Sequence, residues 1–591
     1  MKKILVTALI TSVLMIGISA AAVVFMSKGK TEKTSLEGFD LLENTGYEKE
    51  IDEGSSEELS IGRNGKILSF GEKKRDDIYD VKKSKAVMDK INKLKKKKKY
   101  TFKEPLFIWN PFGTNELSLY YYFRDEESTY IKYTIQVKDP DVPDFTRILN
   151  TNTDSKVTRI HEYSLTGFVP GCQNYLIVRK YNKNGNMLAI DYYDFYVQEL
   201  DEKVPVKIEY KDSMKGSEAI SEGLYCICGY NAGNKKTPNV IPFYDNSGII
   251  RSAIPIKNYR TDRMEFVNHN MMYSYSNRAF AQVSAIGQVL HTYDLGKYRL
   301  HHDFIYNDYG QLWCLATDTG KHSVTVRDCV ISVDMETGKV KKLVDFRTLF
   351  PEILKRAKKN VSSSSLNWID LNSITRVGSS DIVVSSRELS SIIKIRSITS
   401  EYPKIGYLIS DKAFWQKTKY KKYLLLKGAY LDKKWYNLDG DTSGLEEGVK
   451  DFTVQFGQNG VTYEMGKGLG EEQYYLSMLN NNYRVSKTVP NIKYADNTGV
   501  GTAKSAAANS YYYEYIVDEK EGYYGLKRSC KIPYTATGGN VFRVEGNGNM
   551  VINVMGGKTF GEYDKDGQLI RKYSLKAYRV YKYDMKNIWF Y

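Results

Sequence analysis

The sequence predicts an all-β protein that ends in a β-propeller. Tyrosine (49 residues) and glycine (45 residues) are abundant, and long Leu/Ala/Glu-rich helical stretches are scarce, which favours strands joined by turns. From about residue 217 onward, a polar turn containing glycine repeatedly precedes an apolar strand, as at 245–248, 307–311, 335–339, 545–549 and 564–568. Regular hairpins over this length are typical of a propeller, and at four strands per blade six blades would fit, although spacing alone does not fix their number.

Length and charge narrow the class of protein. A chain of 591 residues is too long for one compact core, so we expect two or more domains. The formal net charge is +16, but outside the run 95–99 the lysines are dispersed, as on a solvated surface. Because no RNA- or DNA-binding motif is present, we expect no nucleic-acid partner.

An apolar run of 23 residues, 4–26, lies near the amino terminus between lysines. It is long enough to span a bilayer, so we interpret residues 1–30 as an uncleaved signal-anchor or transmembrane segment. Small residues at 19–22 leave a cleaved signal peptide as the alternative. In both cases the bulk of the chain would be extracytoplasmic, either at the cell membrane or secreted.

Residues 31–99 are expected to form a polar stalk that ends in a short basic helix. Val81, Val87, Ile91 and Leu94 follow a helical spacing, and five consecutive lysines come after Leu94. These lysines could contact anionic lipid headgroups or simply be solvated.

Residues 100–204 change to short alternating strands, among them LSLYYYFR and YIKYTIQV, separated by turns with Asp, Pro and Asn-Gly. Several short strands at this spacing indicate a small β-sandwich, in which we interpret His161 as structural. The propeller is expected over 215–591. Its one convincing helix, 348–359, is predicted to be an insertion between strands.

The cysteines do not indicate a metal or redox site. They are six in number: Cys172, Cys226, Cys228, Cys314, Cys329 and Cys530. There is no C-x-x-C motif and no other metal constellation, so we expect neither a metal nor a cofactor. Most should be small buried hydrophobic residues, although Cys314 and Cys329 flank a hairpin and could pair.

The stretch 366–395 gathers the groups best suited to chemistry. It is predicted to form three short strands, WIDLNSI, DIVVSSR and SSIIKI. Because alternate residues of a strand share a face, Asp370 and Asn372 should lie together, with Arg387 at the end of the second strand. An arginine offers planar donors for an oxyanion such as sulfate, phosphate or carboxylate. The alternative is a structural salt bridge between Asp370 and Arg387.

This stretch resembles the core of the bacterial arylsulfate sulfotransferases, which move a sulfuryl group from one phenol to another. Their pattern is close to D-W-x-H-x-N-S-I, I-V-x-S-S-R and I-K-I, and this chain has NWIDLNSI, IVVSSR and IIKI. The family's histidine is replaced by Asp370. The resemblance covers about 100–591 and implies six blades behind an amino-terminal sandwich. The other matching segments are 158–162, 165–170, 512–519, 544–552 and 578–581.

The resemblance also implies a site at the mouth of the propeller channel. In that family histidines supply the nucleophile, which becomes sulfated, and much of the oxyanion binding. LHHDFI, at 300–305, resembles its H-H-D motif, so one of the two histidines should face the channel. We favour His302, because neighbours on a strand point oppositely; the alternative is that both only hydrogen-bond in the core.

Asn459, in the segment FGQNG, stands where the family has its nucleophilic histidine. An uncharged amide cannot serve as that nucleophile at neutral pH. The family resemblance therefore implies an active site of which only part is kept, and it leaves open whether the chain is an enzyme.

Three hypotheses for the function follow. The first is direct transfer of a sulfuryl group from a phenolic sulfate ester to a phenol acceptor, with His302 as base. Arg387, Asn372 and His301 would bind the sulfonate, and Asp370 would orient Arg387 or act as base. The second is a catalytically degenerate, membrane-tethered propeller that binds an anionic or sulfated ligand. The third is an interaction scaffold. The sequence does not set the oligomeric state.

Overall fold

The computed structural model describes residues 49–50, 57–61, 65–71, 73–151, 155–201, 203–213, 219–230, 239–257, 259–320, 324–360, 365–440, 448–490, 492 and 499–591. The expected signal-anchor at 1–30 and much of the expected stalk lie outside these residues. Within them, no helix combines the length and the apolar character needed to cross a membrane.

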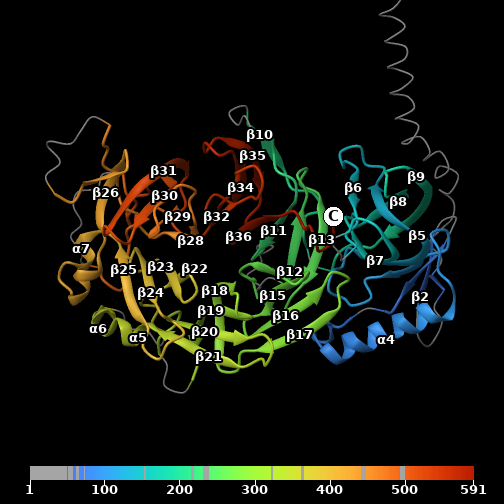
Figure 1. The fold of residues 1–591 in the computed structure, drawn as a ribbon, viewed down its shortest axis with the longest axis horizontal. Helices are drawn as coiled ribbons and strands as arrows, with labels where there is room; N and C mark the ends of the chain where they lie inside the picture. Colours follow the sequence, from blue (N-terminus) through green and yellow to red (C-terminus); the bar gives the residue numbers. More distant parts are fainter. Residues whose placement is uncertain are drawn as a thin grey trace, which may run out of the picture.

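The second part of the chain forms a propeller of six blades arranged in a ring (Figure 1). The first three blades in chain order are β14 (Met264–Val267), β15 (Asn270–Ser276), β16 (Ala279–Ser284) and β17 (Val289–Asp294); β18 (Tyr298–Tyr306), β19 (Gln311–Asp318), β20 (Cys329–Asp334) and β21 (Val340–Asp345); and β22 (Leu371–Val377), β23 (Asp381–Ser386), β24 (Ser391–Arg396) and β25 (Lys404–Ile409). The next two are β28 (Asn459–Glu464), β29 (Gln473–Asn480), β30 (Asn509–Asp518) and β31 (Tyr523–Pro533); and β32 (Asn540–Arg543), β33 (Met550–Val554), β34 (Thr559–Tyr563) and β35 (Leu569–Ser574). The predicted all-β propeller of six blades is therefore confirmed.

The sixth blade closes the ring by joining the two ends of the propeller sequence. Its innermost strand is the carboxyl-terminal β36 (Arg579–Tyr583), which pairs antiparallel with β11 (Leu224–Cys228). β12 (Val240–Tyr244) and β13 (Ile250–Pro255) complete this blade. Beside the closure, Lys582 Nζ lies 2.7 Å from Glu562 Oε2, and both side chains are fully buried.

Insertions add strands and short helices at the outer edges of two blades. β10 (Tyr210–Asp212) adds to β35, and β26 (Leu426–Leu431) with β27 (Lys434–Asn437) adds to β31. The short helices α7 (Lys412–Trp415) and η1 (Lys419–Tyr423) precede β26.

The helix predicted at 348–359 does lie between two blades, but it is divided into α5 (Phe346–Leu349) and α6 (Pro351–Asn360). The break falls at Phe350, because the residue before a proline is disfavoured in the α conformation, whereas proline suits the first position of the next helix.

The amino-terminal domain is built around one long strand, β5 (Ser118–Gln136). Its first half pairs with β4 (Leu106–Trp109) and β7 (Thr158–Thr166), and its second half with β6 (Phe145–Ile148) and β8 (Cys172–Asn182). The two strands predicted here, LSLYYYFR and YIKYTIQV, are thus one continuous strand that keeps its pairing past a bulge. The remaining strands of this nine-stranded sheet are β1 (Lys49–Glu50), β2 (Glu57–Ile61), β3 (Gly65–Ser69) and β9 (Met187–Val197). A sandwich of two separate sheets stays a prediction.

The predicted basic helix is present as α4 (Val81–Lys97), preceded by the short α3 (Arg75–Ile78). Asp80 begins α4 by accepting hydrogen bonds from the backbone amides of Lys82 and Lys83 at 2.8 and 3.1 Å. Ile91 is fully buried against the sheet. The serine Ser84 accepts a hydrogen bond from the backbone amide of Val289 in β17, so the first half of α4 contacts the propeller.

Two sequence interpretations concern side chains away from the channel. His161 is fully buried, stacks on Phe123, and contacts Thr129 and Tyr163 through its two ring nitrogens at 3.0 and 2.8 Å. The possible pairing of Cys314 with Cys329 is wrong: all six cysteines are free. The register of β19 and β20 sets Cys329 opposite Ala316 rather than Cys314, and its thiol donates to the Ala316 carbonyl.

Candidate functional site

A cavity of about 410 Å³ opens at one mouth of the propeller channel, where the innermost strands of several blades begin. We call it the channel-mouth cavity. It is lined by His302, Arg327, Asp370, Asn372, Arg387, Glu388, Asn459, Tyr483, Val485, Lys487, Ala536, Thr537, Gly538, Met555 and Tyr578. The cavity therefore brings together all five residues to which the sequence assigned a catalytic role. They come from four separate segments. The sixth predicted residue, His301, contacts His302.

The H-H-D segment leaves the ladder of β18 as a bulge. Leu300 pairs with Ala316 and Phe304 with Cys314, so three residues lie opposite one, and His302 has a φ of 62°. The prediction that the histidines alternate across a regular strand is wrong for this reason. Both imidazoles are instead buried, with 2.9 Å between their Nδ1 atoms, and His302 is the one that lines the cavity.

The expected salt bridge between Asp370 and Arg387 is not formed. Asp370 Oδ1 accepts a hydrogen bond from Arg327 Nη1 at 2.7 Å, and the backbone amide of Leu371 donates to the Arg327 carbonyl. Arg327 comes from the loop before β20, in the neighbouring blade, and no spacing in the sequence indicated it. The contact to Arg387 is made only by backbone, through its amide and the Asp370 carbonyl at 3.1 Å.

Arg387 lies just past the end of β23 with donors left over. Its Nη2 donates to the Ala536 carbonyl at 3.3 Å, and its guanidinium carbon lies 5.6 Å from the centre of the Tyr483 ring. Its Nε is buried and has no hydrogen-bond partner among the described residues. A partly buried guanidinium with an unused donor is suited to an anion in the cavity.

Asn372 is held from two sides and is almost fully buried. Its amide nitrogen donates to the Gln458 carbonyl at 2.7 Å, and its backbone carbonyl accepts from Arg579. Its side-chain oxygen has no hydrogen-bond partner among the described residues. The second amide hydrogen and the free oxygen both remain for a ligand.

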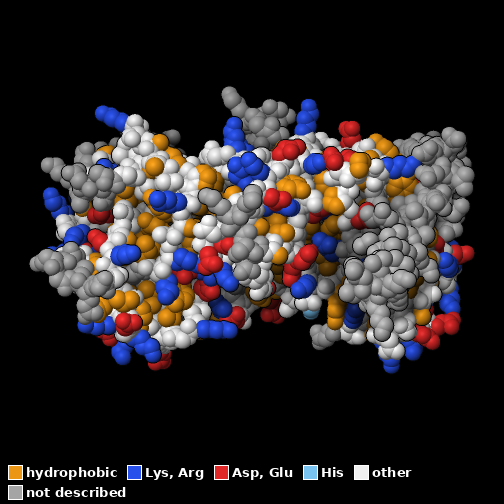
Figure 2. Space-filling model, turned by 90° about the horizontal axis from the view of Figure 1, so that it is seen from above, with side chains coloured by type: hydrophobic (Ala, Val, Ile, Leu, Met, Phe, Trp, Pro, Cys, Tyr) orange, Lys and Arg blue, Asp and Glu red, His pale blue; other side chains and the backbone are white. Residues whose placement is uncertain are grey.

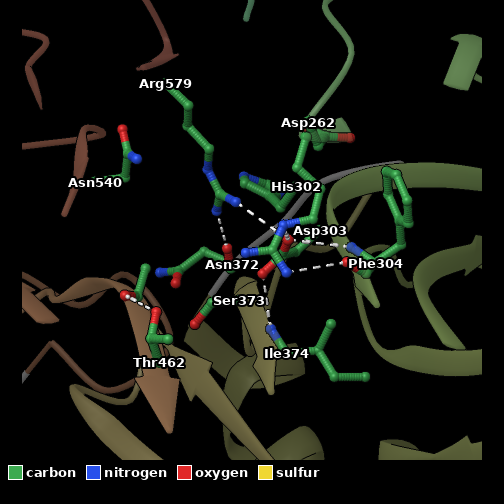
Figure 3. Close-up of polar contacts among 12 residues, drawn as sticks. Asp262, His302, Asp303, Phe304, Asn372, Ser373, Ile374, Thr462, Asn540 and Arg579 are labelled. Carbon is green, nitrogen blue, oxygen red and sulfur yellow. Dashed lines mark hydrogen bonds and ion pairs between the residues drawn. The ribbon is translucent and has the colours of Figure 1, made fainter. Parts of the chain in front are cut away.

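Behind the cavity, Asp303 and Arg579 connect the blades across the channel (Figure 3). Asp303 Oδ1 lies 3.4 Å from Arg579 Nη1, and its Oδ2 accepts from the backbone amide of Ile374 at 3.1 Å. Both side chains are nearly inaccessible to solvent. This network fixes the start of β22, and with it Asn372, relative to β18 and β36.

Asn459 begins β28 and lines the cavity, but its amide nitrogen is already used. It donates to Asn481 Oδ1 at 2.8 Å, and Asn481 in turn donates to the carbonyls of Thr535 and Gly538. The adjoining Gly457 has a φ of 62° and leaves no room for a side chain, because a Cβ would lie 2.6 Å from the Tyr483 carbonyl oxygen. The backbone here is therefore strongly constrained.

Ten of the lining residues were not predicted as site residues, and four of these are Arg327, Glu388, Lys487 and Tyr578. Tyr578 belongs to a segment that matched the sulfotransferase pattern, which could have pointed to it. Its hydroxyl is buried without a partner among the described residues, and its ring lies 5.9 Å from that of His302. The other three occupy loops with no sequence signal.

Burial and cations together keep the histidines neutral. Burial lowers the pKa of His302 well below its usual value, and the charges of Arg260, Arg327 and Arg579 lower it further. Burial likewise lowers the pKa of His301. Burial raises the pKa of Glu388, although hydrogen bonds from Ser486, Thr488 and Lys487 act in the opposite direction. The cavity thus combines three cationic side chains with two carboxyl groups, of which Asp370 is paired to Arg327.

No group of three or more His, Cys, Asp or Glu side chains that could hold a metal occurs in the described part of the chain. On the face shown in Figure 2, Lys and Arg side chains are mixed with Asp and Glu and form no single-sign field. The dispersed positive charge of the sequence is therefore dispersed on this face as well.

The fold and the cavity define a propeller with an anion-suited pocket at the mouth of its channel. The sequence matches the arylsulfotransferase (ASST) family over residues 210–586, and the chain belongs to that family. No curated protein matches the chain.

Several solved structures are similar to part of the chain. A catalytically inactive variant of virginiamycin B lyase from Staphylococcus aureus, with quinupristin, is 10% identical, with a TM-score of 0.30 over 64% of this chain and 89% of its own. A protein of unknown function from Bacteroides caccae and a functionally unknown protein from Desulfotomaculum acetoxidans are each 8% identical. Both have a TM-score of 0.33 and cover 61% of this chain and 98% of their own. With TM-scores this low, these likenesses carry no argument.

Proposed function

We propose that this protein transfers a sulfuryl group from a phenolic sulfate ester to a phenol acceptor in the channel-mouth cavity. One observation carries the proposal: a neutral histidine, an amide and an arginine with an unused donor line the same cavity. Its volume of about 410 Å³ is within the range of small-molecule sites. Membership of the arylsulfotransferase family supports the substrate class.

The sulfonate would be bound by charge-assisted hydrogen bonds. Arg387 offers its buried Nε, Asn372 its second amide hydrogen, and Lys487 a positive charge at the rim. These donors neutralise the non-bridging oxygens as charge shifts during transfer, which is where preorganised donors contribute most to a rate.

His302 would manage the phenol proton. This role requires the tautomer in which His302 donates its Nδ1 hydrogen to His301, so that its Nε2 carries a lone pair for the proton of the acceptor phenol. The acceptor oxygen then forms a bond to sulfur while the bond from sulfur to the donor oxygen breaks, and the proton passes to the departing phenoxide. The products are the phenol of the donor and the sulfate ester of the acceptor.

The amide at Asn459 gives this mechanism its particular form. Because an amide is not a nucleophile at neutral pH, we infer direct transfer between two bound phenols rather than a sulfated histidine at this position. Such a reaction requires donor and acceptor in the cavity together.

A second candidate is a binding protein for a sulfate ester or a similar anion. It is favoured by the commitment of Asn459 to Asn481 and by the carboxylate of Asp370 in the cavity wall. A paired carboxylate still opposes an anion at short range, which weakens catalysis more than it weakens retention of a ligand at the cationic rim.

The test is a transfer assay on the full chain with a chromogenic aryl sulfate and a phenol acceptor. Acceptor-dependent release of the donor phenol is expected, with a loss of about 100-fold or more in Arg387→Ala. Arg376→Ala removes a partly exposed arginine of the same blade as Arg387, paired to Asp308 of the neighbouring blade, and should leave the rate unchanged. No turnover together with measurable binding of the ester would refute transfer and support the second candidate. If the protein shows no turnover and also does not bind the ester, both candidates are refuted.

A further inference from the structure

A second cavity, of about 740 Å³, lies in the amino-terminal domain. We call it the basic groove. It is lined by Asn92, Lys95, Lys96, Lys98, Lys99, Tyr100, Tyr122, Arg124, Ile160 and Glu162. The first half of α4 contacts the propeller through Ser84, and the lysines follow at its other end, roughly 15–20 Å further on at 1.5 Å per residue. The groove therefore lies at the end of α4 that is further along the helix from its contact with the propeller; Figure 1 shows the course of α4.

The side chains that line the groove carry an excess of positive charge. Five cationic side chains line it against one carboxylate, Glu162. That carboxylate is already hydrogen-bonded within the protein, because its Oε1 accepts from Lys95 Nζ at 2.5 Å and from the Tyr120 hydroxyl at 2.7 Å. The cations of the rim are therefore the ones that an incoming anion would meet.

The existing pairs of the rim lysines are weak. Lys98 and Lys99 lie 3.4 Å from Glu104 and Glu126, whose side chains are 71% and 88% exposed. Exposed ion pairs of this kind contribute little and are readily exchanged for another anion. Arg124 contributes its guanidinium, which donates from Nε to the Tyr122 hydroxyl at 2.9 Å.

Apolar side chains stand exposed at the same end of the sheet. Ile160 in the groove wall is 51% exposed, and Met187 and Leu188 at the start of β9 are about half exposed. The strand register places these side chains at one end of the sheet. Thr129 in β5 pairs with the start of β7, which carries Ile160, and also with the end of β8. The strand β9, which begins with Met187 and Leu188, pairs back along β8 from that same end. Lysines next to exposed aliphatic side chains are typical of surfaces that lie at a membrane interface.

We propose that the basic groove docks on the anionic headgroups of a lipid bilayer. The occupant is argued from charge complementarity and from the chain itself. The apolar run 4–26 precedes the first described strand by 22 residues, which can span up to about 75 Å when extended. A bilayer that held this run would therefore lie within reach of the groove. Each lysine that approaches an anionic surface should strengthen docking about fivefold.

The experiment reconstitutes the full chain in lipid nanodiscs. Hydrogen–deuterium exchange of the backbone over 92–100 is compared between discs of phosphatidylcholine and discs of an equal mixture with phosphatidylglycerol. Docking predicts slower exchange in the anionic discs, and the effect should fade at high salt because the contact is electrostatic. Thermal unfolding of every variant checks that the fold is kept.

The decisive variant is the triple charge reversal Lys96→Glu, Lys98→Glu and Lys99→Glu. It should abolish the protection by anionic lipid, whereas the matched reversal of three exposed lysines on the propeller, Lys419→Glu, Lys421→Glu and Lys422→Glu, should keep it. Equal protection in both kinds of disc, or its loss in both triple variants, would overturn the proposal. Equal protection by inorganic phosphate without lipid would also overturn it, because the groove would then be a site for small anions.

Discussion

Arg327 Nη1 lies 2.7 Å from Asp370 Oδ1, and this ion pair joins two neighbouring blades in the wall of the channel-mouth cavity. The family resemblance implies a histidine at this position, and the counter-charge of the carboxylate comes from a loop that the sequence did not single out. The pair explains how a negative charge is accommodated beside groups that are suited to an anion. Arg327 both offsets Asp370 and adds donors of its own.

Removing Arg327 alone should weaken anion binding more than removing the charges of both Arg327 and Asp370. Arg327→Met leaves the Asp370 carboxylate without its partner, so the affinity for phenyl sulfate should fall roughly tenfold or more. Arg327→Met combined with Asp370→Asn should recover most of that loss, as measured by isothermal titration calorimetry. Strictly additive effects of the two substitutions would contradict the coupling.

The activity should be insensitive to pH around neutrality. Burial keeps the pKa of His302 well below the usual value, so its base form persists where an exposed histidine would be half protonated, near pH 6.5. The transfer rate should therefore stay level from about pH 8 to about pH 6 and decline only at lower pH, and His302→Gln should lower it by about 100-fold or more.

The same pKa direction predicts how stability depends on pH. Because the folded-state pKa is depressed, the unfolded chain binds more protons below about pH 6.5, so the free energy of unfolding should decrease as pH falls through this window. His302→Gln should make that decrease shallower in urea titrations.

The pH profile of the transfer rate has its own contradicting outcome. A transfer rate that halves near pH 6.5 would show that His302 titrates normally or is not the base.

Restoring the family's histidines should alter the chemistry. Asn459→His together with Asp370→His should increase transfer at least tenfold and produce a sulfated intermediate, detected as an added sulfuryl mass on the intact protein. Asn459→His alone should do less, since the Asp370 carboxylate would remain beside the new nucleophile. An inactive double variant that still binds the ester would show that the cavity is not arranged for catalysis.

The buried pair at the ring closure should be sensitive to single substitution. Lys582 and Glu562 are both fully buried, so Lys582→Met would leave an unpaired buried carboxylate and should cost about 3–5 kcal/mol. Lys582→Met with Glu562→Leu should restore much of the stability in chemical denaturation, because both charges are then gone. An equally large loss in the double variant would mean that the hydrogen bonds of Lys582 to Ser221 and Tyr225, rather than the charge pair, hold the closure.

Part of the candidate site could be predicted because short segments of the sequence carry recognisable patterns. Turns ending in glycine and alternating apolar residues indicated blades, and the likeness around Asp370, Asn372 and Arg387 indicated which strand ends would meet. The same local rules failed at 301–303, where a bulge replaces strand alternation, and at 118–136, where two predicted strands are one. Bulges and strand lengths depend on the neighbouring strand, which a single segment does not specify.

The sequence by itself indicated that the chain is all-β and ends in a propeller, and the family resemblance indicated that Asn372, Arg387 and one histidine of the 301–302 pair would meet at one mouth of the channel. Only the tertiary structure decided that Asp370 pairs with Arg327 rather than Arg387, that Asn459 is tied to Asn481, and that Tyr578 lies beside His302. The physical reason is that hydrophobic and turn periodicity act within a segment, whereas ion pairs and hydrogen bonds across a channel depend on how six blades close into a ring.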